Sequence, residues 1–343
     1  MSKGAMKAVF ITKPGGPEVL EIREVPTPQP SAEELLVRVH AAGINRADLL
    51  QRQGKYPAPP DAPQEIPGLE FAGEVEAIGA NVKMWRPGQR VFGIVGGGGQ
   101  AECIVAHERM LVEIPPNLSW SEAAAIPEVF VTAHDALWEQ AGLASGENVL
   151  IHAVGSGVGL AAVQLARAIG ATPFGTSRTP EKIERARAFG LQDGIVLGES
   201  LYPLQEKPLQ EKTRQWTAGR GFDVVLDLVG GVYVPASIDA LGKKGRLVLL
   251  ATMGGRKVEI DLGQFLGKRL RLMGSVLRSR SLEEKIAATQ AFAVEVVPLL
   301  AQGKLRPILD REFGFTVKDV QAAYGRLESN ESFGKIVIRI AGR

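Results

Sequence analysis

The sequence contains a single cysteine, Cys103, and no long hydrophobic run. One cysteine cannot form an intrachain disulfide, and it excludes every metal site that needs two thiolate ligands. Asp, Arg or Gly interrupts each apolar stretch well before the roughly 20 residues that cross a bilayer. The N-terminus leads into a strand-like segment, 8–11, without the pattern of a secretion signal. We therefore expect a cytoplasmic protein that does not bind membranes.

The sequence also lacks an excess of charge of one sign, because 40 Lys and Arg oppose 38 Asp and Glu and leave a net charge of +2. A dedicated nucleic-acid binder concentrates positive charge, so nucleic acid is not expected as a partner. Hydrophobic residues make up 45% and charged residues 23%, the balance of a folded globular protein. A chain of 343 residues exceeds one compact core and predicts two domains.

Proline divides the chain into two regions. Fourteen of the 21 prolines lie in residues 1–128, where they disfavour long helices and favour turns and edge strands. Within this region, 35–41 and 71–78 partly alternate apolar and polar residues, as strands with one buried face do. The first third of the chain is therefore predicted to be largely β.

After Pro127 the pattern changes to short, nearly continuous apolar runs, which are typical of parallel strands buried on both faces. The six predicted strands are 148–152, 172–176, 195–197, 223–227, 246–250 and 271–277. Helical segments between them cover 158–169, 180–189 and 209–218. Alternating strands and helices predict an α/β fold with a doubly wound parallel sheet, the Rossmann arrangement of cofactor-binding domains.

The last part of the chain returns to the character of the first. A long amphipathic helix over 282–302, a helix over 317–327 and a strand over 335–340 follow the last parallel strand. We therefore predict a cofactor domain, residues 129–278, inserted into a discontinuous β-rich catalytic domain formed by residues 1–128 and 279–343.

A glycine-rich loop marks the nucleotide site. It stands where a buried strand ends and a helix begins, where free backbone N–H groups and the helix dipole attract a pyrophosphate. The glycine spacing fits the dinucleotide fingerprint in one register, whereas another register places serine where the second glycine usually sits. A tight turn without a ligand is the alternative interpretation. The residues predicted to bind the pyrophosphate are Gly155, Ser156, Gly157, Val158 and Gly159.

The end of the second strand of this domain indicates which cofactor binds. An NAD-specific site places a carboxylate about 20 residues after the glycine loop, but this chain has Ser177 and Arg178 there. A hydroxyl and a guanidinium match the oxygens of a 2′-phosphate, and Lys182, one helical turn further, adds a second positive charge. The sequence therefore predicts NADPH rather than NADH. The alternative is that Arg178 and Lys182 are solvated surface charges.

Several motifs together resemble the zinc-independent quinone oxidoreductases of the medium-chain dehydrogenase/reductase superfamily, most of all the branch with the tumour-suppressor-inducible quinone oxidoreductase. The likeness spans nearly the whole chain. It rests on KPGGPE (13–18), NRADLLQRQGKY (45–56), PGLE (67–70) with Gly73 and Gly79, AAAIP (123–127), the glycine loop with Gln164 and Arg167, LRSR (277–280) and GKIV (334–337).

The resemblance implies a GroES-like fold for the catalytic domain and NADPH-dependent reduction of quinones, with reduction of α,β-unsaturated carbonyls as the alternative. An NADPH-binding protein without useful turnover is a third possibility, since a fold alone does not guarantee chemistry. A homodimer is also expected, and strand 271–277 offers a sheet edge for it. The resemblance places these residues near the nicotinamide: Asn45, Thr132, Ala251, Thr252, Met253, Gly254, Leu277 and Lys335.

No metal is expected at the active site. The zinc-dependent alcohol dehydrogenases of this superfamily carry a cysteine where this chain has Asn45 and a histidine where it has Leu69. Without zinc, alcohol oxidation loses its Lewis acid, whereas hydride transfer to an electron-poor quinone or enone does not need one.

Tyr56 and Asn45 are the candidate catalytic residues. Tyr56 lies on a proline-rich loop, and its phenol can hydrogen-bond the acceptor oxygen or relay a proton. Asn45 can orient the acceptor or the cofactor, but its amide cannot act as an acid. The alternatives are that Tyr56 only packs at the rim and that water supplies the proton.

Overall fold

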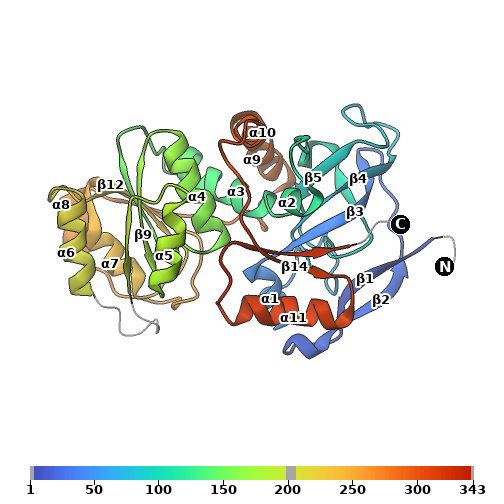
Figure 1. The fold of residues 1–343 in the computed structure, drawn as a ribbon, viewed down its shortest axis with the longest axis horizontal. Helices are drawn as coiled ribbons and strands as arrows, with labels where there is room; N and C mark the ends of the chain where they lie inside the picture. Colours follow the sequence, from blue (N-terminus) through green and yellow to red (C-terminus); the bar gives the residue numbers. More distant parts are fainter. Residues whose placement is uncertain (1–3, 198–205, 341–343) are drawn as a thin grey trace. The chain divides into compact units, whose positions relative to one another are not determined.

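The computed structural model describes residues 4–197 and 206–340 (Figure 1). The chain divides into two compact units. The first consists of Met1–Val131 together with Leu277–Arg343, and the second consists of Thr132–Val276. A continuous segment thus forms the second unit, and two separate segments form the first.

The second unit is built on a six-stranded parallel sheet of order β10-β9-β8-β11-β12-β13. Its strands are β8 (Asn148–Ile151), β9 (Thr172–Ser177), β10 (Asp193–Val196), β11 (Phe222–Asp227), β12 (Leu241–Leu249) and β13 (Arg271–Gly274). Helices of this unit are α4 (Gly157–Ala168), α5 (Pro180–Arg187), α6 (Glu206–Trp216), α7 (Tyr233–Ala240) and α8 (Leu262–Lys268). Residues 149–151 of the central strand β8 are completely buried, as a strand covered on both faces requires. The doubly wound fold expected from the sequence is confirmed.

Three details of this unit differ from the sequence prediction. Strand β12 begins at Leu241 rather than 246, and β13 ends at Gly274 rather than 277. The chain also enters the unit through α3 (Pro127–His134) and the π-helix η3 (Asp135–Gln140), which were not predicted. A π-helix has no distinct apolar period, so the sequence gives little sign of it.

The first unit contains a seven-stranded sheet of order β14-β15-β3-β4-β5-β7, with β6 paired to β3. The strands are β3 (Glu34–Ile44), β4 (Glu70–Ile78), β5 (Arg90–Ile94), β6 (Cys103–His107), β7 (Leu111–Glu113), β14 (Leu309–Gly314) and β15 (Lys335–Arg339). A separate hairpin pairs β1 (Ala5–Ile11) with β2 (Leu20–Pro26). The pairing of β15 with β3 joins the two segments of the unit. Strands β1 to β7 confirm that the first third of the chain is largely β.

The prediction of one long helix over 282–302 is wrong. The helix is interrupted: α9 (Leu282–Glu295) ends before Val296, and α10 (Val297–Ala301) begins anew. Pro298 lies in the first turn of α10, where its missing N–H costs no hydrogen bond, whereas inside a continuous helix it would break one. The other helices are η1 (Pro17–Val19), α1 (Arg46–Arg52), η2 (Glu108–Met110), α2 (Trp120–Ala124) and α11 (Val317–Glu328).

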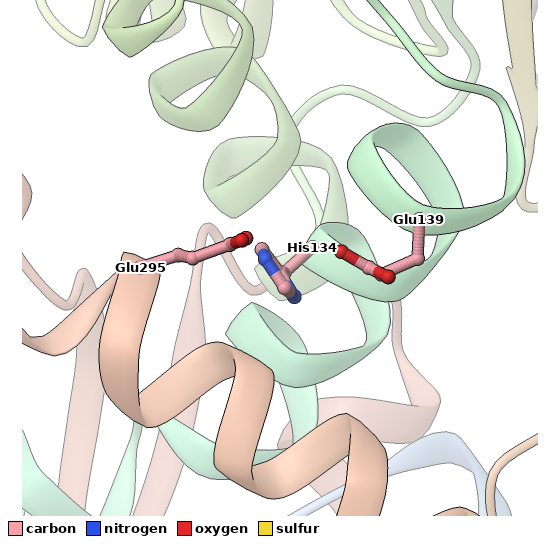
Figure 2. Close-up of side chains that lie close together, drawn as sticks. All are labelled: His134, Glu139 and Glu295. Atoms are coloured by element: carbon pink, nitrogen blue, oxygen red, sulfur yellow. The ribbon is translucent and has the colours of Figure 1, made fainter.

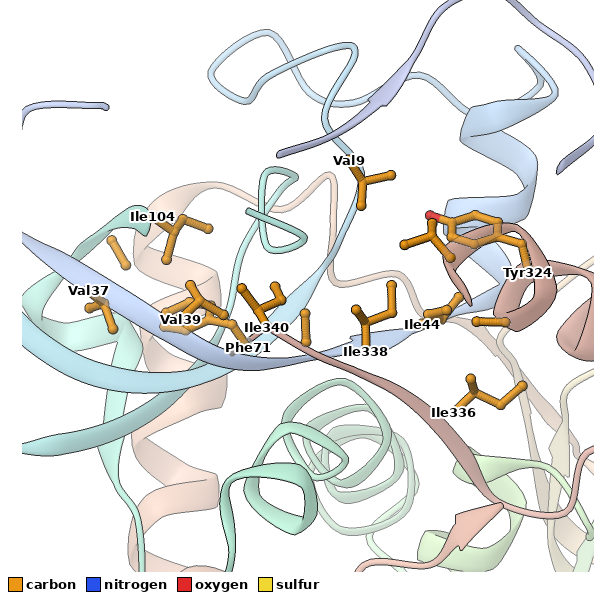
Figure 3. Close-up of a cluster of buried hydrophobic side chains, with 14 of the residues drawn as sticks. Val9, Val37, Val39, Ile44, Phe71, Ile104, Tyr324, Ile336, Ile338 and Ile340 are labelled. Atoms are coloured by element: carbon orange, nitrogen blue, oxygen red, sulfur yellow. The ribbon is translucent and has the colours of Figure 1, made fainter. Parts of the chain in front are cut away.

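An apolar core fixes β15 and α11 against the N-terminal strands (Figure 3). Ile336 and Ile338 of β15 are fully or almost fully buried, and so is Ile44 of β3. Burial of each such side chain is worth about 1.5–3 kcal/mol. Tyr324 of α11 is also completely buried, and its hydroxyl donates to Gln100 Oε1 at 3.0 Å. The last segment of the chain is therefore an integral part of the first unit.

Within the described residues, no helix combines the length and the apolar composition needed to span a bilayer. Cys103, in β6, is half-buried, and burial raises the pKa of its thiol to about 11. The thiol therefore stays protonated at neutral pH.

Candidate active site

The glycine loop of the second unit forms the start of α4. Ser156 is the N-cap of this helix, and its Oγ accepts a hydrogen bond from Gly159 N at 3.1 Å. A Cβ at Gly159 would lie 2.7 Å from Ala153 O, so a side chain there would collide with the backbone. The first N–H groups of a helix have no partner within it. The loop thus keeps bare backbone donors at a helix start, which fits a pyrophosphate.

The position of this loop in the sheet also fits a dinucleotide. Strand β8 has β9 on one side and β11 on the other, so the sheet order reverses at β8. In open α/β sheets, ligands bind at the carboxyl ends of the strands where the order reverses. The loop of residues 152–159 leaves β8 at that end.

The two residues that depart from the usual fingerprint have structural roles. Val154 is completely buried and packs on β9, where a Cβ at Gly175 would lie 2.8 Å from Val154 Cβ. Ser156 caps α4 as described above. The non-glycine residues of the loop therefore support its backbone shape.

The candidate 2′-phosphate residues lie beside the loop. Ser177 ends β9 and is buried, and its Oγ accepts from Thr179 N at 3.3 Å. Arg178 follows and is half-buried, and its charge lowers the pKa of Tyr233, which burial raises overall. The stem of Lys182 lies against the loop, because a Cβ at Gly155 would be 2.8 Å from Lys182 Cδ. Arg178 and Lys182 are therefore both partly buried.

A second loop of this unit is held by Asp227 at the end of β11. Its Oδ1 accepts from Val229 N at 2.7 Å and from Gly230 N at 2.9 Å. Gly230 has φ +72°, and a Cβ there would lie 2.5 Å from Ala251 O. The predicted cofactor segment, residues 251–254, therefore packs on the loop after β11, and Gly254 N donates to Val229 O at 2.8 Å. Thr252 and Met253 of that segment are exposed.

His152, the last residue before the glycine loop, is a structural link. Its ring nitrogens lie 3.0 Å from Thr176 Oγ1 and 2.9 Å from Ser237 Oγ, and the residue is completely buried. Burial lowers its pKa, so the ring is neutral at physiological pH.

In the first unit, sheet pairing brings Asn45 and Lys335 together. Ile336 of β15 pairs with Ile44 of β3, and Lys335 Nζ donates to Ile44 O at 2.9 Å and to Asn45 Oδ1 at 2.5 Å. Asn45 Nδ2 donates to Glu70 Oε1 at 2.8 Å, and Lys335 Nζ lies 2.5 Å from the same oxygen. The amide of Asn45 is thus fixed on both sides between a cation and a carboxylate.

Asp48 holds the start of α1 in place. Its Oδ2 accepts from Asn45 N at 2.7 Å, and its Oδ1 accepts from Gly68 N at 2.9 Å. Burial raises the pKa of this fully buried carboxyl to about 6, although the two backbone donors and the charges of Lys335 and Arg278 favour ionisation. Asp48 therefore links the Asn45 segment to the segment before β4.

Tyr56 is positioned by Arg278. The buried Arg278 guanidinium donates to Gln51 Oε1 (2.6 Å), to Gly96 O (2.8 Å) and to Tyr56 O (3.3 Å), and its carbon lies 5.1 Å from the centre of the Tyr56 ring. Burial raises the pKa of the Tyr56 phenol above its usual value of 10.0. These contacts hold the ring face and the backbone carbonyl of Tyr56.

Glu128, in the first turn of α3, completes this group of charged residues. Its N–H donates to Glu70 Oε2 at 2.8 Å. Burial, and next the negative charge of Glu70, raise the pKa of the Glu128 carboxyl to about 8. A cavity of about 10 Å³ is lined by Glu128, Leu69, Leu277, Arg278 and Lys285, among others.

The two positions compared with zinc ligands have no free ligand atoms. Leu69 is apolar and 1% exposed, and both ends of the Asn45 amide are engaged. Figure 2 shows His134, on α3, and Glu139, on η3, as two possible ligands within the second unit. Glu295, drawn in the same figure, belongs to the first unit.

Sequence reasoning did not single out Glu70, Glu128 or Arg278. A signal was present for the two acids. Glu70 opens the strand Glu70–Ile78, and Glu128 interrupts the apolar stretch from 123 to 131. A charged residue inside an apolar run is rarely buried without a partner. Arg278 was visible only as part of a motif, because its partners are distant in sequence.

Known proteins resemble this chain over nearly its full length. Residues 157–293 match the family described as "Zinc-binding dehydrogenase", and residues 31–116 match the "Alcohol dehydrogenase GroES-like domain". The chain is 30% identical to the human "Quinone oxidoreductase" over 335 residues, which cover 97% of each protein. It is 32% identical to the "Quinone oxidoreductase" of Pseudomonas aeruginosa, over 94% of this chain and 96% of that protein.

Solved structures show the same relationship. A quinone oxidoreductase of Pseudomonas syringae superposes with a TM-score of 0.83 at 30% identity, covering 98% of this chain and all of that one. A mycobacterial protein complexed with NADPH gives 0.84 at 26% identity, with 98% and 100% coverage. The CurK enoyl reductase gives 0.82 at 27% identity, with 97% and 99% coverage.

Proposed function

The chain belongs to the medium-chain dehydrogenase/reductase superfamily of oxidoreductases, and from this premise we propose that it is an NADPH-dependent, zinc-independent quinone reductase. The observation that carries the proposal is the pair of positions Asn45 and Leu69. The side-chain amide of Asn45 is hydrogen-bonded to Lys335 and Glu70, and the side chain of Leu69 has no atom that could bind a metal. A site without a Lewis acid suits an acceptor that is already electron-poor, which a quinone is.

The second unit would hold the cofactor. When bound, NADPH supplies a hydride, which no side chain can provide. The amides of Gly157 and Val158 would bind the pyrophosphate at the start of α4, where Ser156 occupies the N–H of Gly159. Ser177, Arg178 and Lys182 would bind the 2′-phosphate, since a guanidinium and an ammonium favour a dianionic group. The similarity to a mycobacterial protein complexed with NADPH supports this cofactor.

The first unit would bind the acceptor beside Asn45 and Tyr56. Lys335 and Glu70 fix the amide of Asn45, so this side chain is preorganised and does not need to be ordered on binding. The Tyr56 hydroxyl would donate a hydrogen bond to an acceptor oxygen, while Arg278 holds the ring. The protein thus orients and desolvates the acceptor for hydride transfer.

Reduction of α,β-unsaturated carbonyls is the second candidate. The similarity to the CurK enoyl reductase supports it, and an enone is likewise electron-poor without a metal. The two reactions differ in the product, because an enolate is more basic than a hydroquinone anion. An enone therefore depends more strongly on a proton donor.

We also propose that the protein is a homodimer through the edge of the second unit's sheet. Strand β13 is an edge strand, and Leu272 on it is 43% exposed. Leu262 and Leu266 of the neighbouring helix α8 are 65% and 75% exposed. Exposed apolar side chains next to an unpaired edge are a liability in a monomer and are covered in an assembly.

A screen of acceptors tests the proposed function. NADPH oxidation would be followed with ortho-quinones, para-quinones and enones, and NADH would be compared in parallel. Quinone-dependent oxidation, faster with NADPH than with NADH, is expected. Faster enone reduction would favour the second candidate. Tight NADPH binding without oxidation by any acceptor would identify a binding protein and refute the proposal.

A further inference from the structure

Several charged side chains lie close together in the first unit. The carboxyl groups of Asp48, Glu70 and Glu128 lie near the cations Lys335 and Arg278, and Lys285 lines the same cavity as Glu128. Glu70 pairs with Lys335 at 2.5 Å, and Asp48 accepts two backbone N–H groups. Buried charge without a partner is costly.

Glu128 is the carboxyl whose position favours the protonated form. Its backbone N–H donates to Glu70 Oε2, while Lys335 and Asn45 occupy the other oxygen of Glu70, and the negative charge of Glu70 acts on the Glu128 carboxyl. Two carboxylates side by side do not both ionise readily. Arg278 is directed to Gln51 and to two backbone carbonyls.

Glu128 also lines a small, mostly apolar cavity. The cavity of about 10 Å³ that it lines is about the size that holds one water molecule. Arg278 and Lys285 line the same cavity, so a water there has polar partners besides Glu128. Leu69, Leu277 and Met110 make up part of the apolar lining. A single water in this place would lie beside the Glu128 carboxyl.

We propose that Glu128 is the proton donor to the acceptor, acting through a water in this cavity, an inference that rests on the proposed reductase function. The acceptor gains a hydride, with its two electrons, from NADPH and becomes an anion. The O–H bond of Glu128 then breaks, its proton passes to the water, and the water gives one of its own protons to the acceptor oxygen. Hydroquinone leaves, and solvent returns a proton to the Glu128 carboxylate.

The surroundings make this proton transferable in both directions. The groups that face Glu128 are Asp48 on α1, Glu70 on β4, Lys335 on β15, Arg278 and Tyr56, with Lys285 of α9 across the cavity. Burial, Glu70 and Asp48 raise its pKa to about 8, while Lys335 and Arg278 oppose them. The carboxyl is therefore mostly protonated at neutral pH. Once ionised, it lies in the first turn of α3, where the helix dipole favours negative charge.

Tyr56 is the weaker candidate for this step. Burial raises its pKa above 10.0, so its phenol is a poorer acid than a carboxyl with a pKa of about 8. A hydrogen-bond donor with a high pKa is suited to binding a carbonyl oxygen. The two residues thus have separate tasks, one in binding and one in protonation.

The test compares Glu128→Gln with Glu128→Asp and with Glu312→Gln, which changes an exposed glutamate of β14. Glu128→Gln keeps the shape but cannot donate a carboxyl proton. With an enone acceptor, kcat should fall roughly 10²-fold, and the loss of kcat above about pH 8 seen in the parent should disappear. NADPH affinity should not change. Glu128→Asp should restore most of the rate, and Glu312→Gln should match the parent. An unchanged kcat in Glu128→Gln would overturn the proposal.

Infrared difference spectroscopy provides a readout that needs no acceptor. At neutral pH, the parent should show the C=O stretch of a protonated carboxyl that is absent in Glu128→Gln, and this band should titrate near pH 8. Its absence would refute the inference on Glu128 even if quinones are reduced. Conversely, the band together with no reduction of any acceptor would refute the reductase function and, with it, Glu128 as a donor.

Discussion

Lys335 Nζ lies 2.5 Å from Glu70 Oε1, and the two side chains are 4% and 0% exposed. This buried ion pair connects β15, from the last segment of the chain, with β4, from the first. Asn45 bonds to both partners, so the pair also fixes the candidate acceptor site. The same contact therefore joins the two segments of the first unit and fixes the candidate acceptor site.

Removal of one partner of this pair should destabilise the protein strongly. Lys335→Met leaves the Glu70 carboxylate buried and uncompensated, which costs about 3–5 kcal/mol in the free energy of unfolding. Urea unfolding followed by circular dichroism measures it. The double variant Lys335→Met, Glu70→Gln should recover part of the loss. A loss within experimental error in the single variant would show that the pair is not coupled to stability.

Arg178 should determine the choice of cofactor. Arg178→Ala is expected to weaken NADPH binding by about 1–3 kcal/mol, the range of a charge-assisted hydrogen bond, and to leave NADH nearly unchanged. Calorimetric titration with both cofactors measures this. Arg220→Ala, which removes an exposed arginine of the same unit, is the control and should affect neither cofactor. Equal losses for NADPH and NADH would remove Arg178 from the phosphate site.

Tyr56→Phe should act on acceptor binding. Loss of one hydrogen bond costs about 0.5–1.5 kcal/mol, so KM for a quinone should rise up to about tenfold. Because Arg278 holds the ring and the backbone, the variant should keep its fold and its affinity for NADPH. Steady-state kinetics separate KM from kcat. An unchanged KM with quinones and enones would leave Tyr56 as a packing residue at the rim.

Stability should decline with rising pH because of Glu128. Its pKa is raised from 4.5 to about 8, so the folded state holds this proton more tightly than the unfolded state. The favourable contribution of Glu128 to the free energy of unfolding is complete below pH 4.5 and is lost as the pH rises through about 8. Urea unfolding across this range should show a decline that is shallower in Glu128→Gln. Parallel curves for the two proteins would contradict the raised pKa.

The homodimer should depend on the apolar edge of the second unit. Leu272→Asp combined with Leu266→Asp places charge on β13 and α8 and should give a monomer in light scattering. Val294→Asp, at a 74% exposed position of α9, should leave the dimer intact. If the parent protein is already monomeric, this role of the edge is refuted.

The sequence predicts the second unit well because its strands are buried on both faces and read as continuous apolar runs, as residues 149–151 illustrate. It also places Lys335 and Asn45 near one site, through family resemblance. It does not reveal that the two bond to Glu70, since that contact follows from the pairing of β15 with β3 across 291 positions. The break before Pro298 was missed because the apolar pattern of α9 continues into α10.

The raised pKa of Glu128 could not come from sequence either. It results from burial beside Glu70, 58 positions earlier in the chain. Only the folded sheet brings those two carboxyl groups together. A local pattern records that an acid interrupts an apolar run, but not which charges surround it.

The most direct test of the proposed function is the stoichiometry of the reaction in metal-free protein. After dialysis against a chelator and elemental analysis, NADPH consumed and hydroquinone formed would be measured together for an ortho-quinone and a para-quinone. We predict one hydroquinone per NADPH, at a rate that zinc does not increase, with no stoichiometric zinc in the active protein. Turnover that disappears with the chelator and returns with zinc would contradict the proposed chemistry.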